Sequence, residues 1–164
     1  MAVEVDHSDE VVAQWRAQRP DLDAAPMATF TRLWRAARVA DGKLLEVFAR
    51  HGLEAGWFDV LATLRRAGAP HRLSAGTLAR GLVMSTGGMT KRLDKLEAAG
   101  LVARSPDPDD RRGVLVSLTP AGLRVVDQAV EDHLANEARL LSVLSDREVK
   151  ALNASLSKLL AAWA

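Results

Sequence analysis

The stretch that decides the fold is residues 82–119, LVMSTGGMTKRLDKLEAAGLVARSPDPDDRRGVLVSLT. A helix is expected to begin at its Ser/Thr pair, a combination that caps helices, to continue with apolar residues at helical spacing and to stop at a glycine. Met89, Leu93 and Leu96 stand at i, i+4 and i+7, so they form one buried stripe. Two alternating runs then flank a turn rich in Pro, Asp and Arg. The stretch therefore predicts a short helix followed by a β-hairpin wing.

The side of this helix opposite the stripe suits the major groove of DNA. Small and hydrogen-bonding residues occupy its N-terminal end, and base edges in the major groove present matching donors and acceptors. Consecutive Gly87 and Gly88 weaken a helix, and a close approach to DNA explains their presence. The candidate contacts to bases and phosphates are Ser85, Thr86, Gly87, Thr90 and Lys91.

The remainder of the chain is predicted to be helical. A short helix over residues 73–82, capped by Ser74, precedes the helix of the opening stretch, and the two with their turn form a helix-turn-helix. Other helices are expected at residues 8–19, 28–51, 54–67, 120–144 and 145–164, the last two with a Thr-Pro start and a capping box. Asp41-Gly42 is expected to loosen the second helix in its middle, because glycine costs about 1 kcal/mol there relative to alanine.

Composition narrows the class of protein. The chain has 164 residues, is rich in Ala and Leu, and contains 4% aromatic residues, which is typical of a helical domain. It has no cysteine, so disulfides, thiol redox sensing and thiolate metal sites are excluded. No apolar run reaches the ~18 residues that span a bilayer, and the N-terminus does not resemble a signal peptide. A soluble, cytoplasmic protein without membrane contact is expected.

The net charge of +1 argues against a protein that binds nucleic acid over its whole surface. DNA binding must instead rest on local clustering of cations around the predicted helix and wing. In the wing, one of Arg111 and Arg112 is expected to enter the minor groove, while the other is held by an aspartate of the turn. The sequence does not distinguish the two. The aspartates concerned are Asp107, Asp109 and Asp110.

The terminal helices carry more apolar residues than one winged-helix domain can cover, which predicts a homodimer with intertwined terminal helices. A two-fold dimer presents two reading helices one duplex turn apart and matches a palindromic site. The expected division is an N-terminal extension and first dimerisation helix at 1–52, a winged helix-turn-helix at 53–119 and C-terminal dimerisation helices at 120–164. The alternative is a helical subdomain that covers these apolar residues within one chain. Trp34, Trp57 and Trp163 are assigned to the core.

The chain closely resembles the MarR (multiple antibiotic resistance regulator) family. The residues that carry the resemblance are KRLDKLEAAGLVAR at 91–104 and PDPDDRRGVLVSLTPAG at 106–122. The likeness extends over essentially the whole chain from about residue 28. It implies a dimeric winged helix-turn-helix transcription factor, usually a repressor, that a small molecule releases from its operator.

The residues that precede this region resemble the N-terminal extension of a subgroup that responds to urate, and of relatives that respond to aconitate. In that subgroup a tryptophan of the extra helix, an aspartate before the helix-turn-helix, an arginine of the recognition helix and a later arginine are implicated in the ligand response. The matching positions here are Trp15, Asp59, Arg92 and Arg104. Trp15 has an alternative role as the apolar anchor of its helix.

Helical geometry gives the assignment of Arg92 independent support. At ~100° per residue, Arg92 lies within about 70° of the apolar stripe, while Lys91 lies nearly opposite it. An inward guanidinium needs a carboxylate or an anionic ligand, because an unpaired buried charge is costly. Asp59, in an apolar run, is the candidate carboxylate. Whether the two residues bind a ligand or only each other stays open.

An enzyme is not expected, because no nucleophile–base pair, phosphate loop or metal-ligand spacing is visible. No cofactor is expected either. The predicted function is a ligand-responsive repressor that binds palindromic double-stranded DNA as a homodimer and is released by a small organic anion, urate-like or aconitate-like. The alternative is a winged helix used only for protein contact, without ligand sensing.

Overall fold

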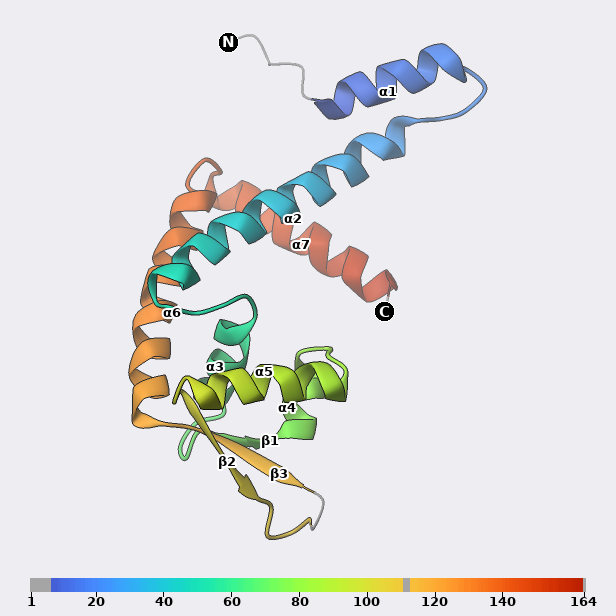
Figure 1. Cartoon of the computed structure of the whole chain (residues 1–164). Coiled ribbons are helices and arrows are strands. Elements are labelled where there is room, and N and C mark those ends of the chain that lie inside the picture. The colour runs from blue at the N-terminus through green and yellow to red at the C-terminus, as the bar shows by residue number, and fades with distance from the viewer. Residues whose placement is uncertain (1–6, 111–112, 164) are drawn as a thin grey trace. The chain divides into compact units, whose positions relative to one another are not determined.

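The computed structural model describes residues 7–110 and 113–163. Figure 1 shows a largely helical chain with one small sheet. The chain divides into two compact units, residues 1–46 and 47–164, which are described separately. Helix α2 runs through the boundary, so that its last turn belongs to the second unit. The mainly α fold class with a small β-wing is confirmed.

The first unit is a pair of helices. Helix α1 spans His7–Gln18 and ends before Pro20, and α2 spans Ala25–Arg50. The backbone N–H of Ala25 donates to the side chain of Asp23, which explains why α2 begins earlier than expected. An ion pair of 2.7 Å between Asp9 and Arg32 joins the two helices, and Val12 is buried. Helix α2 is unbroken through Asp41-Gly42, so the expected loosening was wrong.

The second unit contains the helix-turn-helix and its wing. Its elements are α3 (Trp57–Arg66), β1 (Arg72–Ser74), α4 (Ala75–Gly81), α5 (Thr86–Ala98), β2 (Val102–Pro106), β3 (Val114–Leu118), α6 (Pro120–Leu141) and α7 (Asp146–Trp163). The sheet is antiparallel in the order β1-β3-β2. Strand β1 was not predicted, since Leu73 was assigned to a helix. A three-residue strand carries no periodicity, and its pairing with β3 is a long-range contact.

Local signals set the ends of these helices as expected. The hydroxyl oxygens of Ser74, Ser85 and Thr119 accept backbone N–H bonds at the starts of α4, α5 and α6. Glu148 accepts from both the backbone N–H and the hydroxyl of Ser145, which confirms the predicted capping box. These hydrogen bonds hold the pKa of the Glu148 carboxyl below its usual value.

The core of the second unit lies where α3, α5, α6 and the sheet meet. Its fully buried side chains include Leu61, Leu64, Leu78, Leu96, Val116 and Val126. Trp57 is 8% exposed, as expected of a core residue. Trp34 and Trp163 are 63% and 54% exposed, so their assignment to the core was wrong for the single chain. A helical stripe identifies an apolar face but not whether the same chain covers it.

Candidate nucleic-acid interface and ligand residues

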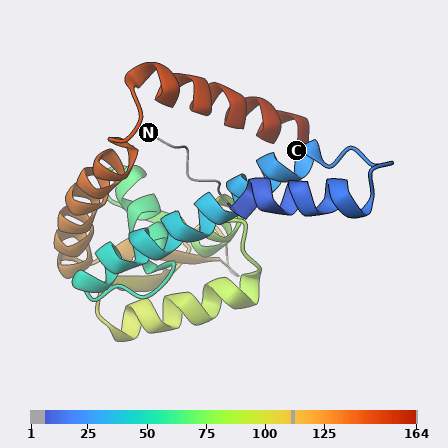
Figure 2. The same cartoon turned by 90° about the horizontal axis from the view of Figure 1, so that it is seen from above.

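Helix α5 has one buried side and one exposed side. Met89, Leu93 and Leu96 are at most 2% exposed and pack in the core, which confirms the predicted stripe. Thr86, at the first position of the helix, and Gly87, Thr90 and Lys91, away from the stripe, are all exposed. Figure 2 shows α5 at the periphery of its unit, with one long side turned away from the unit's other elements. Helix α5 therefore presents to solvent a small, polar surface that includes the cation Lys91.

Helix α4 holds the beginning of α5 in place. The backbone N–H of Met84 donates to the carbonyl of Ala79 at 2.8 Å, and that of Val83 donates to Arg80 at 3.2 Å, which closes the turn between the helices. Ser85 then caps α5 by accepting from the N–H of Gly88 at 3.2 Å. The Ser85 oxygen is therefore a structural cap as well as a candidate phosphate contact.

The wing is a hairpin whose turn is closed by two backbone hydrogen bonds. The N–H of Asp107 donates to the carbonyl of Gly113, and the N–H of Gly113 donates to the carbonyl of Asp110. Strands β2 and β3 pair from Val102 with Leu118 to Pro106 with Val114. In the turn, the side chain of Asp107 accepts from the N–H of Asp109 at 3.0 Å. Asp107 is one of the three aspartates that the sequence offered as partners of a wing arginine. Arg111 and Arg112 lie outside the described residues. Their assignment to the DNA contact stays a prediction.

Arg104, on β2, joins the wing to the end of α5. Its guanidinium donates twice to one carboxylate oxygen of Glu97, at 2.9 and 2.6 Å, and lies 2.7 Å from Asp94. Its backbone N–H donates to the other oxygen of Glu97. These bonds lower the pKa of the Glu97 carboxyl and raise that of Arg104. The sequence suggested Arg104 as a ligand contact and did not indicate its pairing with Glu97. No sequence pattern predicts which residue of a strand will contact the end of a helix.

Replacing Arg104 by alanine should loosen the wing. The paired Glu97 carboxylate has a lowered pKa, so its stabilising contribution is present above the ordinary value of 4.5 and is lost as the pH falls through the lower, folded value. We expect the melting temperature of Arg104→Ala to fall less than that of the wild type between pH 6 and about 3.5, as followed by circular dichroism. Arg66→Ala, which removes an arginine of α3 that donates to the Thr63 hydroxyl, serves as the control. An unchanged pH profile in Arg104→Ala would contradict the pairing.

Arg92 leans inward and Lys91 outward, as the helical geometry predicts. The Arg92 guanidinium lies directly against Gly56, at the start of α3, where an added Cβ would overlap it. It donates to the thioether sulfur of Met84 at 3.0 Å. Gly56 has φ of 74°, a conformation that favours glycine. Sequence reasoning missed both neighbours, since they adjoin Arg92 only in the folded chain.

Asp59 and Trp15 are placed differently from Arg92. The Asp59 side chain is exposed on α3, and none of the hydrogen bonds or ion pairs among residues 7–110 and 113–163 joins it to Arg92. Trp15 belongs to the first unit, is 45% exposed, and lines a small cavity of about 170 Å³ with Arg19, Leu22 and Met27. The expected Arg92–Asp59 pair is therefore not formed in the structure.

The helix-turn-helix, the exposed side of α5 and the hairpin wing together define a winged-helix protein that binds DNA. The chain matches the MarR family over residues 51–113. It is 41% identical to the HTH-type transcriptional regulator PecS of Dickeya dadantii over 149 residues, which cover 91% of this chain and 90% of PecS. The chain belongs to the MarR family.

Solved structures agree with this assignment. The chain superposes on AbsC, a MarR family transcriptional regulator from Streptomyces coelicolor, with a TM-score of 0.79 at 21% identity, over 87% of this chain and 96% of AbsC, a likeness of fold alone. It matches a mutant of Escherichia coli MarR complexed with operator DNA with a TM-score of 0.72 at 28% identity, over 89% and 97% of the two chains. The protein is a DNA-binding transcriptional regulator. Among the described residues, no helix has the length and hydropathy needed to cross a membrane.

Proposed function

We propose that this regulator is a repressor that binds a palindromic operator as a homodimer and is released by a small organic anion of the urate or aconitate type. The two-sided character of α5 is the observation that carries the proposal. Its exposed side holds Thr86, Gly87, Thr90 and Lys91 for the major groove, while Arg92 reaches the opposite side. Binding of an anion to Arg92 would therefore act on the helix that reads DNA.

The surroundings of Arg92 suit an anion-operated switch. A thioether sulfur is a weak acceptor, whereas a carboxylate or urate-like anion accepts strong, charge-assisted bonds from the planar guanidinium. An anion would thus draw Arg92 away from Met84, which lies in the turn between α4 and α5 directly before the cap Ser85. In the proposal Trp15, Asp59 and Arg104 complete the ligand response, as the subgroup resemblance implies. Arg104 would take part through the wing, because it is bonded to Glu97.

A homodimer is supported by the C-terminal helices. Helix α7 has no buried residue along its 18 positions, and Leu152 and Leu160 on it are 42% and 64% exposed. Leu134 and Leu141 of α6 are 57% and 41% exposed. Several large apolar side chains left exposed on helices are typical of protein interfaces. In this proposal residues 1–52 and 120–164 form the dimerisation region, and 53–119 reads DNA.

The proposal is tested on a duplex selected by the protein from a random library. We expect the selected site to be palindromic and its affinity to fall steeply as salt rises, because phosphate contacts release counterions. Arg111→Ala and Arg112→Ala are compared on this site, and one of them should bind far more weakly than wild type. If both bind as wild type, the wing assignment is wrong. Weak, salt-insensitive binding would favour a protein-contact module.

Effector release is tested by adding urate or aconitate to the protein–duplex complex and following fluorescence anisotropy. We expect one of these anions to release wild-type protein, and Arg92→Ala to bind the anion at least about 10-fold more weakly, since charge-assisted hydrogen bonds contribute about 1.5–3 kcal/mol each. Arg50→Ala, which removes an exposed arginine at the end of α2, is the matched control. Unchanged anion affinity in Arg92→Ala would refute the sensor role of Arg92.

A further inference from the structure

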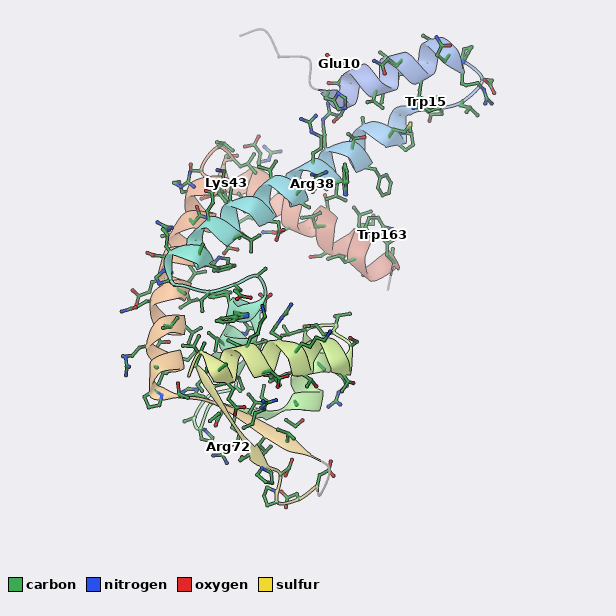
Figure 3. All side chains as sticks on the ribbon, in the orientation of Figure 1. Glu10, Trp15, Arg38, Lys43, Arg72 and Trp163 are labelled. Carbon is green, nitrogen blue, oxygen red and sulfur yellow. The ribbon has the colours of Figure 1, made fainter. Side chains whose placement is uncertain are left out.

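Val83 lies in the turn between α4 and α5 and has a strained backbone. Its φ is 52°, in the left-handed region that a β-branched residue rarely adopts. Its N–H donates to the carbonyl of Arg80 at 3.2 Å, and the next N–H, of Met84, donates to that of Ala79 at 2.8 Å. Figure 3 shows this turn as a loop at the N-terminal end of α5. The hydrogen bonds of the turn hold a conformation that glycine or asparagine would adopt with less strain.

The Val83 side chain is directed to solvent. It is 94% exposed, whereas its neighbours Leu82 and Met84 are half-buried. Met84 turns toward α5, where its sulfur accepts from Arg92 and its methyl carbon would lie 3.4 Å from a Cβ added to Gly88. A valine that is both strained and exposed gains little from packing within its own chain. Strain of this kind is typical of functional positions, which points to a contact with another molecule.

DNA is the molecule that the position of Val83 favours. Val83 stands three residues before Thr86, the first residue of α5, so the Cα atoms of the two residues lie within about 11 Å of each other. The major groove of B-DNA is about 12 Å wide. When the start of α5 enters the groove, the edge of the same groove is therefore within reach of Val83.

The chemistry of valine selects one feature of the groove. A valine side chain has no hydrogen-bond donor or acceptor, so it cannot read the polar pattern of the base edges. The apolar group in the major groove is the 5-methyl group of thymine. Deoxyribose carbons are also apolar, but they are the same at every base and carry no sequence information. A contact between Val83 and a thymine methyl group would distinguish one base pair from the others.

We infer that Val83 is a specificity-determining residue, and that it contacts the methyl group of a thymine beside the bases that α5 reads. The inference rests on the proposed placement of α5 in the major groove, and on neither the palindrome nor the effector. It adds an apolar contact to the polar contacts proposed for Thr90 and Lys91.

The test replaces the thymines of the selected duplex, one at a time, by deoxyuridine, which lacks only the 5-methyl group. We expect one replacement to weaken wild-type binding about 4-fold in fluorescence anisotropy, the effect of burying about one methyl group. Val83→Ala should bind the thymine duplex about 4-fold more weakly than wild type, and should bind the thymine and deoxyuridine duplexes equally. Val143→Ala is the matched control, because Val143 is 85% exposed in the link between α6 and α7. It should keep the wild-type loss at this thymine.

Three results would overturn the inference. In the first, wild type loses no affinity at any thymine. In the second, Val83→Ala keeps the full loss at every thymine, which would assign Val83 to a contact with the DNA backbone or to the fold. In the third, Val83→Asn melts at a lower temperature than wild type, although asparagine tolerates the left-handed conformation; we expect it to melt higher.

Lys91→Ala separates this inference from the placement of α5 on which it rests. Lys91 is exposed on α5, and its removal should weaken DNA binding if α5 enters the groove. If Lys91→Ala binds more weakly and Val83→Ala binds as wild type, α5 remains in the groove and only the assignment of Val83 is refuted. If both variants bind as wild type, the placement of α5 is refuted as well.

Discussion

Gly122→Ala is expected to lower the free energy of unfolding by about 3 kcal/mol, the upper end of the usual cost of overpacking. Gly122 lies in the first turn of α6 and is buried against the link between α5 and β2. A Cβ there would overlap the carbonyl oxygen of Leu101 and lie 2.9 Å from its carbonyl carbon. The obstacle is backbone, which cannot rotate away as a side chain could.

The close approach at Gly122 is maintained by a set of hydrogen bonds. The Thr119 hydroxyl donates to the carbonyl of Gly100 at 2.7 Å, the Thr119 N–H donates to that of Leu101 at 3.1 Å, and the Gly122 N–H donates to the Thr119 hydroxyl oxygen at 3.0 Å. Moving α6 outward to admit a methyl group would break the two bonds from Thr119 to Gly100 and Leu101, which follow the end of α5. The destabilisation should therefore extend to α5 and the wing.

Urea denaturation followed by circular dichroism measures the effect of Gly122→Ala. Gly42→Ala is the control, because Gly42 lies inside α2 with nothing within 4 Å of an added Cβ. The control should stabilise by about 0.5–1 kcal/mol, since alanine favours a helix interior. Equal stability of Gly122→Ala and wild type would show that α6 does not approach Leu101 as closely as described.

Gly87→Glu is expected to reduce DNA affinity about 100-fold or more, roughly 2.7 kcal/mol, without lowering stability. Gly87 is exposed at the second position of α5, and an added Cβ meets nothing within 4 Å. An acidic side chain in the first turn of a helix is favourable by about 0.3–1 kcal/mol. The same carboxylate would face DNA phosphates and base edges across the groove. Stability and DNA binding should thus change in opposite directions.

Fluorescence anisotropy on the selected duplex and thermal melting of the free protein measure the two effects of Gly87→Glu. Gly42→Glu makes the same chemical change on α2, outside the helix-turn-helix, and separates a groove contact from a general charge effect. It should bind DNA within about 2-fold of wild type, because Gly42 belongs neither to the helix-turn-helix nor to the wing. Wild-type affinity in Gly87→Glu would place the N-terminal end of α5 outside the groove.

The helix ends and the two-sided character of α5 could be predicted because the signals are local. Ser85 and Thr119 cap the helices that follow them, and Ser145 with Glu148 forms a capping box. The buried side of α5 follows from apolar residues at i, i+4 and i+7, and the inward lean of Arg92 from the same period. These features depend on residues within one or two helical turns.

The partners of the key charges could not be predicted, because they come from distant segments. Arg92 was expected to face Asp59 of α3. Its guanidinium instead lies against Gly56 and donates to Met84, in the turn before α5. Strand β1 was missed because its pairing with β3 spans more than 40 residues and has no local pattern. The exposure of Trp34 likewise depends on what covers the helix, which helical periodicity does not specify.

The sequence by itself determined the winged helix-turn-helix, its caps and which side of α5 is exposed, since short-range periodicity and capping chemistry decide these. Only the tertiary structure decided that Arg104 fastens the wing to Glu97 and Asp94, that Arg92 rests on Gly56, and that α6 leaves no room beside Leu101 for any residue but glycine. The physical reason is that ion pairs and steric limits depend on distances between segments remote in sequence, and chain folding alone sets those distances.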